Sequence, residues 1–224
     1  MLVDEDWRQP DARVCCGWGA NGLRALAPSV DCVVVVDVLS FSTSCAVARE
    51  AGAVVLPHDP DRSVPDGVLV AGPRSLEQPS LSPSSLRRLA PGTRIVIPSL
   101  NGSRLLALAR NLGVTAITGC LRDRHQVARA VARLDRVALI AAGERWTDDT
   151  VRFALEDWLG VGAIAALLTG SFSPEVVAAQ AAFDAHVPDL EAALRRTASG
   201  RELVRRGFEQ DVVLAAEVGT EAER

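Results

Sequence analysis

Asp37 is the first residue of this sequence whose type and position could do chemistry. It stands near the end of an apolar run that begins at Cys32, and the hydroxyls of Ser42 and Thr43 follow at the start of a predicted helix. A carboxylate that ends a buried strand faces the edge where α/β sheets bind ligands, and free N–H groups at a helix start favour an anion. The arrangement predicts a metal ion with a bound phosphate. The alternative is that Ser42 or Thr43 only caps the helix.

A second polar loop consists of Asn101, Gly102, Ser103 and Arg104. Asn-Gly is a turn signal in itself, so a tight connection between a strand and a helix is the alternative interpretation. Arg104 adds a planar pair of donors that suits phosphate, sulfonate or carboxylate. We predict that all four residues bind substrate.

Three further acids, Glu144, Glu156 and Asp157, follow the apolar run 137–141. The helix dipole favours acids in a first turn, so a solvated helix start is the alternative for Glu156 and Asp157. Adjacent helical side chains point about 100° apart. At most one of this pair is therefore expected to bind a metal, while the other supports it.

Missing residue types exclude several enzyme classes. All 24 basic residues are arginine, so the sequence lacks the lysine of P-loop NTPases, of protein kinases and of pyridoxal-phosphate enzymes. A haloacid-dehalogenase phosphatase needs a second aspartate two residues after the first, at position 39, where this chain has leucine, and also a later lysine, which this chain lacks. The net charge of −4, without long runs of one sign, predicts no nucleic-acid partner.

The cysteines and the hydropathy indicate the compartment. Five cysteines without a C-x-x-C spacing fit neither a disulfide framework nor a zinc site. The acidic N-terminus is unlike a signal peptide, and the longest uncharged run, 158–174, is too short to span a membrane. We expect a cytoplasmic protein without a membrane partner. A homodimer is expected only because dimers are the commonest assemblies.

Apolar runs of strand length alternate with helical patterns along the chain. This alternation predicts a three-layer α/β/α fold with a mixed, mostly parallel sheet. Runs such as Val33–Val36 suit central strands that are covered on both faces. We expect one domain, residues 1–224, that is essentially helical from about residue 154. Strands are predicted at 13–17, 32–38, 54–56, 68–71, 94–97, 115–118 and 137–141, and helices at 21–26, 42–51, 83–89, 103–112, 124–134, 154–168, 174–186 and from 199 onward.

An internal repeat relates residues 37–52 to residues 98–113 without gaps. Each copy is predicted to be a strand end, a polar loop, a helix and a glycine suited to a left-handed cap. Chance similarity between two βα units is the alternative. A true duplication would place the two loops at the same edge of one sheet, near Glu144. The identical pairs are Leu39/Leu100, Ser42/Ser103, Ala46/Ala107, Ala48/Ala109, Arg49/Arg110 and Gly52/Gly113.

Taken in order, these motifs resemble the 2-phosphosulfolactate phosphatase family. The resemblance covers nearly the whole chain and includes a C-terminal signature. It rests on the segments 33–39 with Ser42 and Thr43, 101–104, 142–146, 155–157 with 160–164, 199–203 and 207–212.

The resemblance implies a magnesium-dependent phosphatase that converts 2-phosphosulfolactate to sulfolactate and phosphate, a step of coenzyme M biosynthesis. Asp37 matches the family's strand-terminal acid, Asn101-Gly102 its Asn-Gly loop and Glu156-Asp157 its Glu-Asp pair. We accordingly expect Mg²⁺ to bind Asp37 and Glu156. The expected catalytic residues are Asp37, Glu144, Glu156 and Asp157.

The chain departs from the family pattern at three places. Ser40 stands where the family usually has arginine, Pro73 where it has glutamate, and Leu81 where it has asparagine. Two hypotheses follow: a divergent phosphatase acting on a small anionic metabolite, or a binding protein of the same fold that has lost catalysis. In either case Arg74 and Arg104 are the arginines expected to hold a phosphate, sulfonate or carboxylate, with Arg145 and Arg201 as substitutes.

Overall fold

The centre of the molecule is a parallel four-stranded sheet. The computed structural model describes residues 5–58 and 63–219. The strand order is β1-β7-β2-β6, so the all-valine stretch of β2 is an inner strand. Val33 pairs with Ala116 on one side and with Ala138 on the other. The strands are β1 (Val14–Trp18), β2 (Cys32–Val36), β6 (Thr115–Gly119) and β7 (Val137–Ala141).

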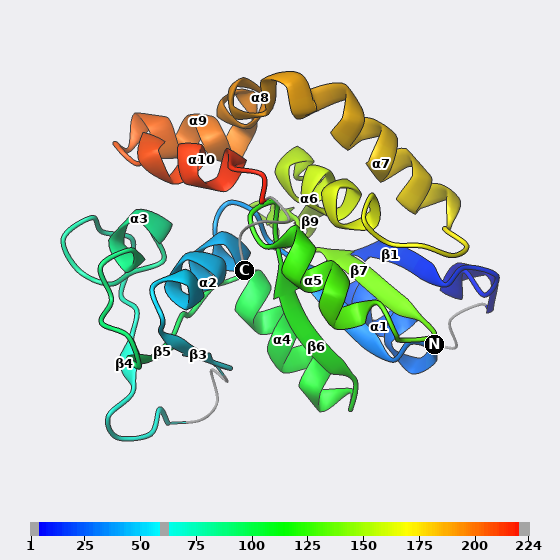
Figure 1. The fold of residues 1–224 in the computed structure, drawn as a ribbon, viewed down its shortest axis with the longest axis horizontal. Helices are drawn as coiled ribbons and strands as arrows, with labels where there is room; N and C mark the ends of the chain where they lie inside the picture. The colour runs from blue at the N-terminus through cyan, green and yellow to red at the C-terminus, as the bar shows by residue number, and fades with distance from the viewer. Residues whose placement is uncertain (1–4, 59–62, 220–224) are drawn as a thin grey trace.

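Helices cover both faces of this sheet, as Figure 1 shows. Alternate residues of β2 point to opposite faces, so Val33 and Val35 join one hydrophobic core while Val34 and Val36 join the other. The three-layer prediction is therefore confirmed. On one face lie α1 (Gly19–Leu26) and α4 (Gly102–Asn111); on the other lie α5 (Arg124–Val131), α6 (Leu155–Ala165) and α7 (Pro174–His186).

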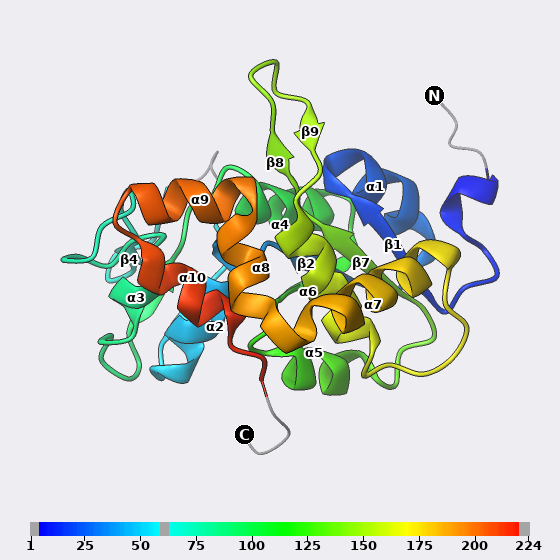
Figure 2. The same ribbon diagram turned by 90° about the horizontal axis from the view of Figure 1, so that it is seen from above.

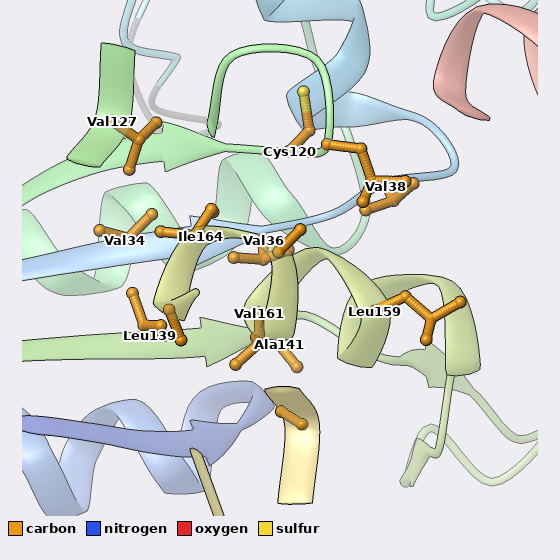
Figure 3. Close-up of a cluster of buried hydrophobic side chains, with 14 of the residues drawn as sticks. Val34, Val36, Val38, Cys120, Val127, Leu139, Ala141, Leu159, Val161 and Ile164 are labelled. Carbon is orange, nitrogen blue, oxygen red and sulfur yellow. The ribbon is translucent and has the colours of Figure 1, made fainter. Parts of the chain in front are cut away.

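The core between α6 and the sheet fixes where α6 begins. Leu159, Val161 and Ile164 are fully buried in this core; in Figure 3, Ile164 lies next to Val34 and Leu139 of the sheet, while Leu159 lies beyond the ends of the strands. This packing places the first turn of α6, with its two acids, at the ends of β2 and β7.

A smaller parallel sheet of order β3-β5-β4 lies beside the first. Its strands are β3 (Val54–Leu56), β4 (Leu69–Val70) and β5 (Arg94–Val96). The helices α2 (Phe41–Glu50) and α3 (Pro83–Leu86) pack against it around a separate core of Phe41, Ile95 and Leu86.

The remaining elements lie over the ends of the central strands. A short antiparallel hairpin, β8 (Glu144–Arg145) and β9 (Val151–Arg152), extends away from the sheet (Figure 2). Neither β8 nor β9 was predicted, because a strand of two residues carries no detectable period; the equally short β4 was predicted only as part of the longer run 68–71. The C-terminal helices are α8 (Leu190–Arg196), α9 (Ala198–Arg205) and α10 (Glu209–Ala216), and the single-turn 3₁₀ helices are η1 (Glu5–Arg8), η2 (Ala27–Ser29) and η3 (Val187–Asp189).

The two copies of the internal repeat enter different sheets. The first follows β2 of the four-stranded sheet and the second follows β5 of the three-stranded sheet, so the expectation of a single sheet is wrong. Both copies nevertheless end as predicted, since Gly52 and Gly113 adopt φ of 82° and 75°. Their polar loops also meet, because the three-stranded sheet brings the start of α4 against the end of β2.

Two further features concern the membrane and redox predictions. In the described ranges, no helix is both long and apolar enough to span a membrane. All five cysteines are free thiols and all are buried.

Candidate active site

The starts of α2 and α4 converge on Asp37. Its Oδ1 accepts a hydrogen bond from the N–H of Phe41 (3.2 Å), the first residue of α2. Its Oδ2 accepts one from the N–H of Gly102 (2.9 Å), the first residue of α4. These are free N–H groups that a helix leaves at its start, and they favour an anion. Asp37 is thus the point at which the two repeated loops meet.

Gly102 is required by this close approach. A Cβ atom at this position would lie 2.2 Å from Cδ1 of Phe41 and 2.8 Å from Oδ2 of Asp37. No larger residue fits without moving the aromatic ring or the carboxylate. The Asn-Gly pair therefore does more than form a turn: its glycine admits the Asp37 side chain.

Burial raises the pKa of Asp37 from 3.8 to about 6. The hydrogen bonds from Phe41 and Gly102 oppose this shift, while the negative charges of Glu144 and Glu156 add to it. Asp37 consequently gains or loses its proton at a pH close to neutral. A cation beside it would offset both the cost of burying its negative charge and the repulsion from Glu144 and Glu156.

Glu144 is held in place by the loop of the second repeat. Its Oε1 accepts hydrogen bonds from Nδ2 of Asn101 (3.0 Å) and from the N–H of Arg145 (3.0 Å). Oδ1 of Asn101 in turn accepts from Nε of Arg145 (3.2 Å), and Arg145 forms an ion pair with Asp149 (2.8 Å). The structure therefore places Asn101 next to Glu144, and it directs Arg145 along the hairpin.

Asp157 joins the ends of the two central strands. Its Oδ1 accepts from the N–H of Val38 (2.7 Å) and its Oδ2 from the N–H of Gly143 (2.8 Å). Burial, and then the charges of Asp37 and Glu156, raise its pKa well above 3.8. Both carboxylate oxygens bind the main chain and, unlike Asp37, Asp157 does not line the cavity beside Glu144, so the structure gives Asp157 a positioning role.

Glu156 is buried but opens into a different cavity. That cavity has a volume of about 210 Å³ and is also lined by Arg152, His186 and Arg196. The charge of Glu156 still contributes to the raised pKa of Asp37. The two residues expected to share Mg²⁺ therefore line separate cavities.

Three predicted substrate-binding hydroxyls are buried and bound to the main chain. The hydroxyl of Ser42 donates to the carbonyl oxygen of Val35 (3.0 Å), that of Thr43 to Val38 (2.7 Å) and that of Ser103 to Ser99 (2.7 Å). None of the three lines the cavity at Asp37. They fix the two loops, and none caps its helix.

The cavity at Asp37 has a volume of about 300 Å³ and both signs of charge. Its lining includes two arginines, Arg74 and Arg206, and three acids, Asp37, Glu144 and Glu202. Glu202 and Arg206 were not predicted as site residues, because α9 is remote from Asp37 along the chain, although Glu202 belongs to the segment 199–203 on which the family resemblance partly rests. The lining residues are Asp37, Leu39, Ser40, Arg74, Leu81, Ser99, Leu100, Asn101, Glu144, Ser199, Glu202, Leu203 and Arg206.

Arg74 is held rigidly at the wall of this cavity. Its Nη1 forms an ion pair with the fully buried Asp211 (2.6 Å), and its Nη2 donates to the hydroxyl of Ser40 (2.9 Å). The guanidinium also lies over the ring of Phe208, 5.5 Å from its centre. Asp211 accepts from the hydroxyl of Ser82 as well (2.6 Å), so Arg74 has little freedom to move.

The other predicted anion-binding arginines lie outside this cavity. Arg104 is exposed on α4, and Arg201 is exposed and donates to the carbonyl oxygen of Arg196. Neither lines the cavity at Asp37. A helix turns by about 100° per residue, so the loop position of Arg104 did not determine its direction.

The carboxylates of Asp37 and Glu144 have the chemistry of a magnesium site. Within residues 5–58 and 63–219 there is no group of three or more His, Cys, Asp or Glu side chains placed to hold a metal. Mg²⁺ is commonly bound by one or two carboxylates together with water and substrate phosphate. Since Asp37 and Glu144 line one cavity and repel each other, they fit a cation of this kind.

Comparison with known proteins establishes the family. The model of 2-phosphosulpholactate phosphatase matches residues 23–222. The chain belongs to this family. Its similar relatives include a probable 2-phosphosulfolactate phosphatase of Gloeobacter violaceus, 30% identical over 85% of each chain. The 2-phosphosulfolactate phosphatase of Methanothermobacter thermautotrophicus is 31% identical over 80% of this chain and 79% of its own.

Membership of the 2-phosphosulfolactate phosphatase family confirms the resemblance found in the motifs. It also identifies the chain as one of a family of phosphoric monoester hydrolases. Ser40, one of the departures from the family pattern, lies in the cavity and binds Arg74.

Proposed function

We propose that this protein is a Mg²⁺-dependent phosphatase that hydrolyses 2-phosphosulfolactate, or a small phosphomonoester of similar charge, in the cavity at Asp37. The observation that carries the proposal is the convergence of two helix starts on one buried carboxylate, beside Glu144 and Arg74. Both the phosphate and the acidic groups of such a substrate need cationic partners, and this cavity offers arginines with room for a cation.

Asp37 and Glu144 are the residues proposed to hold Mg²⁺. Glu144 takes the place first given to Glu156, because it lines the same cavity as Asp37. When bound, Mg²⁺ supplies neutralisation of phosphate charge as a Lewis acid. Asn101 and the N–H of Arg145 hold Oε1 of Glu144, which leaves Oε2 for a ligand.

Arg74 orients the anionic end of the substrate. Its guanidinium is fixed by Asp211 and Ser40, so it loses little conformational freedom when an anion binds. Asp37, with both oxygens on main-chain N–H groups, keeps one position as its charge changes. Arg206, which directly follows α9 and pairs with Glu202 (2.8 Å), lines the same cavity and adds a second cationic group.

Release of phosphate from 2-phosphosulfolactate by the purified protein tests this proposal. We expect release with Mg²⁺ and loss of release with excess chelator, restored by added Mg²⁺. Binding of the substrate, measured by calorimetry, without any phosphate release would instead support the alternative, a binding protein without catalysis.

A further inference from the structure

A further cavity, larger than the one at Asp37, lies between the two sheets. Its volume is about 400 Å³. One wall is β6, which is an edge strand of the four-stranded sheet, and the facing wall is β3, an edge strand of the smaller sheet. The helices α2 and α4 form the floor between them. A cavity of this size matches those that hold small organic ligands.

Most of its lining is apolar. Phe41 and Cys45 of α2 face Leu106 of α4, with Ile97 and Val55 from the smaller sheet. Apolar surface of this kind gains free energy when it is covered, and it favours a ligand with a hydrocarbon or aromatic body.

The polar groups at its rim are cationic. Arg49 and Arg110 line the cavity, and they are equivalent positions of the internal repeat. Arg49 donates to the hydroxyl of Thr118 (2.9 Å) and lies 3.7 Å from Asp123. Arg110 is exposed and has no ion-pair partner within residues 5–58 and 63–219. Among the described residues that line this cavity there is no aspartate or glutamate.

We propose that this cavity is a binding site for an amphipathic organic anion. The apolar body of the ligand lies between Phe41 and Leu106, and its single anionic group accepts hydrogen bonds from Arg110, with Arg49 on the other side. Nothing in the proposal depends on the phosphatase reaction, because none of the lining residues belongs to the cavity at Asp37.

Phe41 connects this cavity with the one at Asp37. It lines the cavity between the two sheets, and its N–H donates to Oδ1 of Asp37. A test must therefore distinguish occupancy of this site from binding of an anion at Asp37. Inorganic phosphate serves that purpose, since it is anionic but has no apolar body.

Calorimetric titration with 1-naphthoate tests the site directly. We expect saturable binding with one ligand per chain, and binding should persist in excess inorganic phosphate. The uncharged analogue 1-naphthalenemethanol should bind about tenfold more weakly, because it lacks the charge-assisted contact. Arg110→Gln should weaken 1-naphthoate binding by about the same factor and leave binding of the alcohol unchanged.

Two variants provide the controls. Arg129→Gln, an exposed arginine on α5 that lines no cavity named above, should bind 1-naphthoate as the wild type does. Ala116→Phe, which fills part of the cavity from β6, should lose binding while its circular dichroism stays native. Equal affinity in Arg110→Gln and Arg129→Gln would overturn the proposal, as would displacement by phosphate. It would also be overturned if sedimentation showed a dimer that excludes the ligand, because the cavity would then be a subunit interface.

Discussion

At the scale of single residues, Asp37 and Gly102 depend on each other. The carboxylate fits against the start of α4 only because residue 102 has no side chain. We expect Gly102→Ala to lower kcat at least tenfold and the free energy of unfolding by about 1–3 kcal/mol, because Phe41 and Asp37 must both move. Steady-state kinetics and urea denaturation measure the two effects.

Gly72→Ala is the matched control for that substitution. The nearest atom to a Cβ at Gly72 is the carbonyl oxygen of Pro79, at 3.9 Å, which is an ordinary contact. Its stability should stay within about 0.5 kcal/mol of wild type. If Gly102→Ala changes kcat and the free energy of unfolding as little as Gly72→Ala does, the close contact at Asp37 affects neither activity nor stability.

Arg74 and Arg104 could not be distinguished from the sequence, but the structure distinguishes them. Both were predicted to bind an anion, yet only Arg74 lines the cavity. Arg74→Gln should raise KM for 2-phosphosulfolactate at least tenfold, the cost of about 1.5–3 kcal/mol for a charge-assisted contact. Arg104→Gln should leave KM within twofold. A larger effect of Arg104→Gln would show that the exposed arginine, and not the rigid one, holds the substrate.

At the scale of elements, Asp157 is the residue that keeps β2, β7 and α6 in register at the site. Asp157→Ala leaves the N–H groups of Val38 and Gly143 without their acceptor. Removing a buried carboxyl group, whose pKa burial raises, offsets part of this cost, so we expect a net loss of about 2–3 kcal/mol in the free energy of unfolding. Urea denaturation at pH 7 measures it, and Asp135→Ala, an exposed acid, should change it by less than about 0.5 kcal/mol. Equal stability of the two variants would contradict the positioning role.

The elements themselves were largely predictable, because apolar runs and helical periods are local. All seven predicted strands form, within one or two residues of their predicted bounds. The smaller sheet was not predicted, because the pairing of strands is not local. The sequence of residues 94–96 does not indicate that they pair with residues 54–56 and 69–70 instead of with the central strands. Glu202 and Arg206 were not predicted for the same reason, because they line the cavity at Asp37 only once the C-terminal helices have packed. Asp37, Asn101 and Glu144 were found because each comes at most five residues after the end of a strand, where the chain is still at the edge of the sheet.

At the scale of the whole molecule, the buried acids connect stability to pH and to Mg²⁺. The pKa of Asp37 rises from 3.8 to about 6 on folding, and burial also raises that of Asp157. The folded state therefore binds more protons. The contribution of Asp37 to stability is complete below pH 3.8 and is lost as pH rises through about 6, while that of Asp157 is lost as pH rises through its own raised pKa. We expect bound Mg²⁺ to raise the free energy of unfolding by about 1–3 kcal/mol at pH 8 and by almost nothing at pH 5.

Thermal unfolding at the two pH values, with and without Mg²⁺, measures this effect. Asp37→Asn should abolish the stabilisation by Mg²⁺ at pH 8, since the amide carries no charge. Equal stabilisation by Mg²⁺ at pH 5 and pH 8, or in the variant, would mean that the cation binds elsewhere.

The most direct test of the account is phosphate release by Asp37→Asn compared with wild type, using 2-phosphosulfolactate and saturating Mg²⁺. Asparagine is nearly isosteric with aspartate but cannot supply a carboxylate to the cation or the two acceptor oxygens that Phe41 and Gly102 use. We expect Mg²⁺-dependent release by wild type and a loss of at least 100-fold in the variant, with a native circular dichroism spectrum. A folded variant that releases phosphate at the wild-type rate would contradict it.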